Sequence, residues 1–161
     1  MSASREHRYA ARIEWSGAAH GSTKTYAGYS REYTIAVDGK PVLTGSADPA
    51  FRGDAAHYNP EDLLLAALSA CHLLTYLALC AREGIAIVAY ADDATGTMSE
   101  TGGAGRFTRV LLRPVVEIDE ERIERATALH DEAHAECFVA NSVNFPVEHE
   151  AVVRRAPASP R

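Results

Sequence analysis

The stretch NPEDLLLAALSACHLLTYLALC, residues 59–80, combines a helix start with a long apolar run. Asn59 is a favourable N-cap, Pro60 suits the first helical position, and Glu61 complements the positive end of the helix dipole. Gly84 is the first residue expected to end the helix. Because leucine and alanine occupy nearly every side, we expect a central helix that is buried on all faces.

The composition is that of one ordinary globular domain. The chain has 161 residues, of which 47% are hydrophobic and 24% charged, and this gives room for one core but not for a second full domain. We therefore predict a single domain over residues 1–161, with a structured part from about residue 8 to 153 and a disordered tail over 154–161. The net charge of −6 argues against the basic surface that nucleic-acid binding needs.

The apolar run from Leu63 to Ala81 has about the length of a membrane span. Ser69, His72 and Thr75 interrupt it, and a polar cap precedes it, so a buried helix is the better interpretation and no membrane partner is expected. The N-terminal residues lack the apolar core and cleavage site of a secretory signal. Three cysteines are too few for a disulfide scaffold, and we expect them to be free thiols in a reducing cytoplasm.

Strand patterns lie on both sides of the central helix. The expected elements are strands over 9–15 and 26–33, a hairpin over 33–45 around Asp38-Gly39, strands over 85–98 and 105–118, a polar helix over 119–137, and a last strand over 144–153. The predicted class is α+β, with a three-stranded antiparallel sheet before the helix. One small sheet covers only one side of an apolar helix, so we expect a second copy of the chain to cover the rest.

The three cysteines have different expected roles. Cys71 and Cys80 are nine residues apart, about 900° of rotation at roughly 3.6 residues per turn, so they face opposite sides of the helix. Cys80 lies among leucines, where a small buried side chain is expected. Cys71 is fixed in mid-helix, whereas Cys137 ends the second predicted helix, and this is the layout of a two-cysteine peroxidase. From spacing alone, two unrelated core cysteines remain an open alternative.

Two motifs carry a resemblance to a known family. The run YNPEDLLLAALSACH, residues 58–72, is followed by HAECFVANSV, residues 134–143, whose cysteine comes 66 residues after the first. With the predicted order of elements, these motifs resemble the OsmC/Ohr superfamily of osmotically induced and organic-hydroperoxide-resistance proteins. The resemblance implies the OsmC-like fold and an intertwined homodimer, in which sheets wrap two long central helices.

The resemblance also implies thiol-dependent reduction of organic hydroperoxides in oxidative and osmotic stress defence. It assigns Cys71 as the peroxidatic thiol, Cys137 as the resolving thiol and Glu61 as the active-site carboxylate. No bound cofactor is implied, only an external dithiol reductant such as a lipoylated or thioredoxin-like protein. Glu61 lies ten residues before Cys71, about 15 Å along one helix, so it would have to serve the Cys71 of a partner subunit.

A buried thiol needs a nearby cation to hold its thiolate form. The family supplies an arginine from an N-terminal turn, but this sequence has GAAHG at residues 17–21, with alanine where the arginine would fall. Arg31 and Arg52 are the candidate replacements, and His72, next to the thiol, is a third.

Two alternatives remain open. In the first, the same dimer holds a small hydrophobic ligand in its apolar cleft, or reacts with another electrophile, with little or no peroxide turnover. In the second, His130, His134 and Cys137 bind a metal ion, since the two histidines stand at i and i+4 on one helical face. Asp131 stands where the H-E-x-x-H motif has glutamate, and a solvated helix face is the simpler interpretation of the pair.

Overall fold

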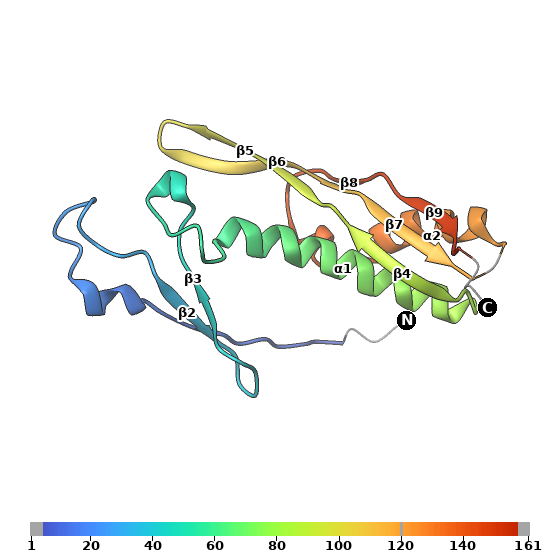
Figure 1. Cartoon of the computed structure of the whole chain (residues 1–161), viewed down its shortest axis with the longest axis horizontal. Coiled ribbons are helices and arrows are strands. Elements are labelled where there is room, and N and C mark those ends of the chain that lie inside the picture. The colour runs from blue at the N-terminus through green and yellow to red at the C-terminus, as the bar shows by residue number, and fades with distance from the viewer. Residues whose placement is uncertain (1–4, 120, 158–161) are drawn as a thin grey trace. The chain divides into compact units, whose positions relative to one another are not determined.

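The computed structural model describes residues 5–119 and 121–157 (Figure 1). The chain forms two compact units, of which the first ends at Leu63 and the second begins at Leu64. Helix α1, Pro60–Arg82, begins in the first unit and continues through the second. The single domain expected from composition stays a prediction.

The first unit is built on a three-stranded antiparallel sheet in the order β1–β2–β3. Its elements are β1 (Arg12–Glu14), η1 (Ser16–His20), β2 (Tyr33–Ala36), β3 (Leu43–Gly45) and η2 (Pro49–Phe51). The hairpin predicted over 33–45 is confirmed, and Gly39 in its turn has a φ of 71°, which glycine tolerates. Residues 26–29 form turns and bends and residues 30–32 are irregular, so the extended segment predicted over 26–33 is wrong except at Tyr33, which begins β2. The Arg31 guanidinium donates to the carbonyls of Tyr26 and Tyr29, which holds this segment folded back.

The start and end of α1 agree with the sequence. The side-chain oxygen of Asn59 accepts the N–H of Asp62 at 2.7 Å, and the Asp62 carboxylate accepts the N–H of Asn59 at 3.2 Å. This reciprocal pair is a capping box, with Pro60 in the first helical position. Gly84, at a φ of 69°, follows the helix end as predicted.

The second unit contains two three-stranded sheets, in the orders β4–β7–β9 and β5–β6–β8. Its elements after α1 are β4 (Ile87–Asp92), β5 (Thr95–Thr101), β6 (Ala104–Leu112), β7 (Pro114–Ile118), α2 (Ile123–Glu136), η3 (Ala140–Ser142), β8 (Val147–His149) and β9 (Val152–Arg155). Each of the three strands predicted after the central helix is therefore divided into two, and its halves lie in different sheets. β8 pairs with β6, and β9 with β7, in parallel.

The Asp92 carboxylate lies where the strands divide. One of its oxygens accepts the backbone N–H of Arg113, at the break between β6 and β7, at 2.6 Å. The other accepts the hydroxyl of Ser69, on α1, at 2.5 Å. A polar side chain at the end of β4 thus ties two of the three strand breaks, β4/β5 and β6/β7, to the central helix, a long-range contact that strand periodicity cannot reveal.

The C-terminal strand extends past the predicted end of the structured part. β9 includes Arg154 and Arg155, and the Arg154 guanidinium pairs with the Glu117 carboxylate of β7 at 2.8 Å. The predicted disordered tail is therefore wrong at residues 154–155, and its last residues, 158–161, lie outside the described residues.

Two apolar cores lie along α1. Leu68 packs with Val110, Leu112 and Val147 of the β5–β6–β8 sheet, and later residues of α1 pack with the β4–β7–β9 sheet and α2. By length and composition alone α1 would also pass for a membrane span, but its packing in both cores supports the predicted core helix.

The opposite face of α1 is uncovered in the described chain, although the sequence predicts burial on all sides. This face is apolar, and Leu74 on it is 66% exposed. Its other exposed members are Ala67, Ala70 and Ala78.

Candidate active site

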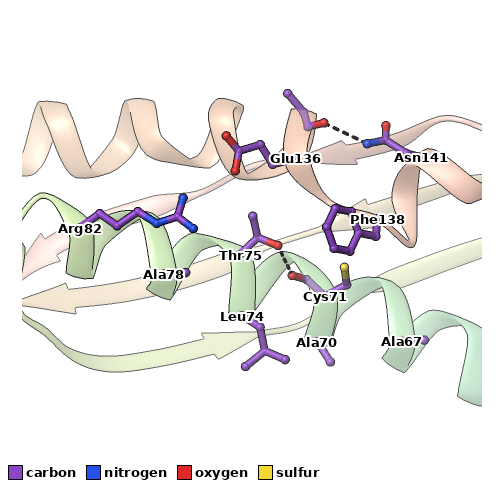
Figure 2. A pocket seen from close by; sticks show the side chains of 11 residues that line it. Ala67, Ala70, Cys71, Leu74, Thr75, Ala78, Arg82, Glu136, Phe138 and Asn141 are labelled. Atoms are coloured by element: carbon purple, nitrogen blue, oxygen red, sulfur yellow. Dashed lines mark hydrogen bonds between the residues drawn. The ribbon is translucent and has the colours of Figure 1, made fainter. Parts of the chain in front are cut away.

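Two thiols 66 positions apart in the sequence come together in the second unit. Cys71 lies in the middle of α1, and its Sγ points toward the segment that follows α2, where Phe138 lies (Figure 2). Cys137 is the C-cap of α2, and its side chain is hydrogen-bonded to that of Cys71. Both are free thiols. The fold therefore brings together the two cysteines that the sequence motifs single out.

The two thiols differ in burial. Cys137 is 1% exposed, and Cys71 is half-buried beside an open cavity. Burial raises the pKa of Cys137 to about 11, and the hydrogen bond with Cys71 adds to this rise. Cys137 consequently keeps its proton at neutral pH, which makes it a weak nucleophile and a good hydrogen-bond donor to Cys71. This asymmetry favours Cys71 as the attacking thiol.

The cavity beside Cys71 has a volume of about 830 Å³ and follows α1 (Figure 2). Near the thiol its wall is apolar, with alanines of α1, Leu74 and the 81%-exposed Phe138. Arg82 and Glu136 are its charged wall residues. Arg82 is the one cation among the described residues that line the cavity, and it stands eleven residues, about 16 Å along the helix, from Cys71. It is therefore not beside the thiol.

Glu136 and Asn141 of the cavity wall are residues that sequence reasoning did not single out. Asn141 donates through its side-chain amide to the Ala135 carbonyl at 2.9 Å, which fixes the turn after α2 (Figure 2). Both residues belong to the motif HAECFVANSV, so the motif itself was the signal that could have identified them.

Glu61 and Arg31 lie in the first unit, where both line a cavity of about 410 Å³. Aromatic side chains form much of its wall, including Trp15, Tyr29, Tyr33 and Phe51. The Arg31 guanidinium lies 3.9 Å from the ring centroid of Tyr29 and 4.9 Å from that of Tyr26. These cation–π contacts hold the cation in place. The fold thus places Arg31, one of the candidate cations, in the same cavity as Glu61, the predicted active-site carboxylate.

The Tyr33 hydroxyl is a further polar group of this cavity. It is buried and has no hydrogen-bond partner among the described residues. Burial raises the pKa of Tyr33, and the charge of Glu61 raises it further.

The other two candidate cations have different positions. Arg52 is exposed, caps η2 with a φ of 66°, and lines neither of these two cavities. His72 is 1% exposed, with its Nε2 3.0 Å from Nδ1 of His130. Burial, with His149 and His134 nearby, lowers the pKa of His72 to about 4. It is therefore neutral at pH 7, and the hypothesis that His72 supplies the cation is wrong.

The structure gives the metal alternative no preformed site. Within the described ranges, no group of three histidine, cysteine, aspartate or glutamate side chains could hold a metal ion. His130 bonds to His72 on α1, and Cys137 bonds to Cys71, so the residues of the hypothetical site have other partners.

Comparison with known proteins agrees with this fold. Residues 53–151 match the OsmC-like protein family. The chain is 29% identical to an OsmC-like protein of unknown function from Vibrio cholerae, with a TM-score of 0.83 over 91% of this chain and 100% of that one. An organic hydroperoxide resistance protein from Elizabethkingia anophelis has the same fold, with a TM-score of 0.65 and 19% identity over 94% of this chain and 100% of that one.

A curated relative, the uncharacterised protein YmaD of Bacillus subtilis, is 23% identical over 114 residues, which are 68% of this chain and 76% of that protein. The family match covers more than half of the chain and includes both motif cysteines. The α+β architecture, with a three-stranded N-terminal sheet, a long central helix and a second helix, is the fold expected from the resemblance. The chain therefore belongs to the OsmC-like protein family, within the OsmC/Ohr superfamily.

Proposed function

We propose that this protein is a thiol peroxidase that reduces organic hydroperoxides in stress defence, within a reducing cytoplasm. The observation that carries the proposal is the hydrogen-bonded Cys71–Cys137 pair beside an apolar cavity. The name of the Elizabethkingia anophelis neighbour, an organic hydroperoxide resistance protein, supports the same chemistry. The apolar wall near Cys71 favours a substrate with a hydrocarbon group over hydrogen peroxide.

The reaction has three balanced steps. The Cys71 thiolate attacks the distal oxygen of the peroxide, the O–O bond breaks, and the alkoxide takes a proton and leaves as an alcohol. Cys71 is then a sulfenic acid, which condenses with the Cys137 thiol to give a disulfide and water. An external dithiol, such as a lipoylated or thioredoxin-like protein, reduces this disulfide and is itself oxidised to a disulfide.

A homodimer would complete the site. The exposed apolar face of α1 favours cover by a second copy, and the described cavity lining offers no cation next to Cys71. Arg31 and Glu61 share one cavity, which favours them as a pair supplied by the partner subunit. In this arrangement the arginine stabilises the thiolate and the carboxylate orients the arginine. Arg52 is the less favoured cation because it is exposed and lies away from Glu61's cavity.

Peroxide consumption by the wild-type protein tests the proposed function. With a dithiol reductant, we expect cumene or tert-butyl hydroperoxide to be consumed with a higher kcat/KM than hydrogen peroxide, because the apolar wall binds their hydrocarbon groups. Light scattering on the same sample should give a dimer mass. Lack of turnover, with a hydrophobic probe bound in the cavity, would instead support the non-catalytic ligand-binding alternative, which the exposure of Leu74 and Phe138 also favours.

The resolving role of Cys137 gives a separate prediction. In Cys137→Ser, we expect one equivalent of hydroperoxide to leave Cys71 as a sulfenic acid, because the thiol that would condense with it is missing. Dimedone labelling followed by peptide mass spectrometry should find the adduct on Cys71. Cys80→Ser is the matched control, since Cys80 is buried elsewhere in the core, and it should still form the Cys71–Cys137 disulfide. Absence of a Cys71–Cys137 disulfide in the wild type after the same treatment would contradict this role.

A further inference from the structure

Four of the seven histidines of the chain lie together where α1, α2 and β8 meet. The ring centroid of His149 is 5.5 Å from that of His72, 6.0 Å from that of His130 and 5.8 Å from that of His134. None of these four side chains has a role in the thiol chemistry described above. We call His72, His130, His134 and His149 the histidine cluster.

The innermost pair of the cluster has an incomplete set of hydrogen bonds. His72 and His130 are 1% and 0% exposed, and Nε2 of the first lies 3.0 Å from Nδ1 of the second. This contact needs one ring to donate and the other to accept. The remaining atoms, Nδ1 of His72 and Nε2 of His130, are buried without a partner in the described parts of the chain. In either tautomer the neutral pair therefore leaves one unpaired donor and one unpaired acceptor.

Within residues 5–119 and 121–157, no negative charge contacts this pair. The Tyr76 ring stacks on His130 with centroids 3.8 Å apart, and beyond it lie the Tyr90 ring and the Cys80 thiol. The one carboxylate that contacts the cluster among the described residues is that of Asp131. It reaches Nε2 of His149 at 3.2 Å and is itself 84% exposed.

A proton on the innermost pair would therefore be a buried, unpaired charge. Both nitrogens that lack a partner, Nδ1 of His72 and Nε2 of His130, would then carry a hydrogen with no acceptor. Burial and the neighbouring histidines lower the pKa of His72 to about 4 and that of His130 to about 3. The pair is neutral at pH 7, and acid favours whatever conformation lets its nitrogens reach water.

The pair joins the two helices that carry the reactive thiols. His72 directly follows Cys71 on α1, and His130 lies on α2, whose C-cap is Cys137. The Cys137 thiol is buried only while α2 stays packed on α1. Weaker packing of α2 on α1, caused by protonation of the His72–His130 pair, would therefore also expose Cys137.

We propose that the histidine cluster is an acid-sensitive latch, which docks the end of α2 on α1 while it is neutral and exposes Cys137 when its innermost pair is protonated. The latch controls the distance between the two thiols without touching peroxide. It can be tested in the absence of peroxide, so its failure would leave the proposed peroxidase function untouched.

The first test follows the imidazoles of the full-length wild-type protein by NMR between pH 7.5 and 3.5. We expect two of the seven histidines to stay neutral to below pH 5.5, and their protonation to coincide with shifts of the α2 backbone amides. Titration of all seven histidines above pH 6 would overturn the latch.

The second test measures exposure of Cys137 with 4,4′-dithiodipyridine, which reacts with thiols in acid. Rates are read by peptide mass spectrometry and divided by the rate of glutathione at the same pH. We expect the normalised rate of Cys137 to rise at least tenfold from pH 7.5 to 4.5 while the far-UV circular dichroism is retained. Loss of the far-UV signal over the same range would overturn the proposal, because the whole fold would then be opening.

A variant separates the innermost pair from other acid effects. His130→Gln keeps a hydrogen-bonding side chain that does not titrate and leaves His72 as the one titrating ring of the pair, so we expect the normalised rate of Cys137 to rise less than tenfold over the same range. His7→Gln, an exposed histidine of the first unit, is the matched control and should behave like the wild type. A tenfold rise in His130→Gln would overturn the latch. Should this variant not fold, the wild-type NMR titration decides alone.

Discussion

Cys71→Ser is expected to lower the rate of organic hydroperoxide reduction by about 10³-fold or more, because a serine hydroxyl does not ionise near neutral pH and is a far weaker nucleophile than a thiolate. The loss should fall on kcat/KM. The measurement is consumption of cumene hydroperoxide with an excess of dithiol reductant. Thermal unfolding of the variant should be close to that of the wild type, since Cys71 is half-buried beside an open cavity.

Cys80→Ser is the control for this substitution. Its thiol lies in the second core with Tyr76 and Leu79, away from the cavity, and burial raises its pKa. We expect activity near that of the wild type, with some loss of stability from a hydroxyl in an apolar site. Activity retained by Cys71→Ser and lost by Cys80→Ser would show that the wrong thiol has been assigned.

Glu61→Gln is expected to lower activity by about 10- to 100-fold, the usual effect of removing a group that orients a catalytic side chain. A sharper result is expected from dimers in which one chain carries Glu61→Gln and the other carries Cys71→Ser. If Glu61 serves the thiol of the other subunit, each mixed dimer contains one site with both Cys71 and Glu61. Random pairing then restores about a quarter of the wild-type sites.

Co-expression of the two variants with different affinity tags, and purification through both tags, isolates the mixed dimer. Its activity per dimer should approach half that of the wild type. The separately purified variants, combined without subunit exchange, are the control. Activity of the mixed dimer no higher than the sum of these controls would place Glu61 in the site of its own chain or outside the mechanism.

Short sequence patterns predicted the parts of the fold that depend on interactions between residues close together in the chain. Asn59, Pro60 and Gly84 mark the limits of α1 because caps act within one turn. Two of the three strand breaks were missed because they involve Asp92, whose partners Ser69 and Arg113 lie 23 and 21 positions away. Alternation of apolar residues continues across such a break, so periodicity shows one strand where the fold has two.

The candidate site was predictable only where a motif was present. Spacing alone could not pair Cys71 with Cys137, and the resemblance supplied the pair that the fold then brought together. The sequence could name Arg31 and Arg52 only as alternative candidates for the cation, because the alanines of GAAHG remove the usual signal and the stacking of Arg31 on Tyr29 is a tertiary contact. The histidine cluster was equally hidden, since His72 and His130 are 58 positions apart.

The parallel pairings of β8 with β6 and of β9 with β7 have a consequence for synthesis of the chain. Both sheets of the second unit take their third strand from residues 147–155, so neither is complete until this segment has left the ribosome. His149, which completes the histidine cluster, belongs to the same segment. The end of α2 and Cys137 thus gain their full packing only after this segment has emerged, because the contacts that complete the unit join residues far apart in the sequence.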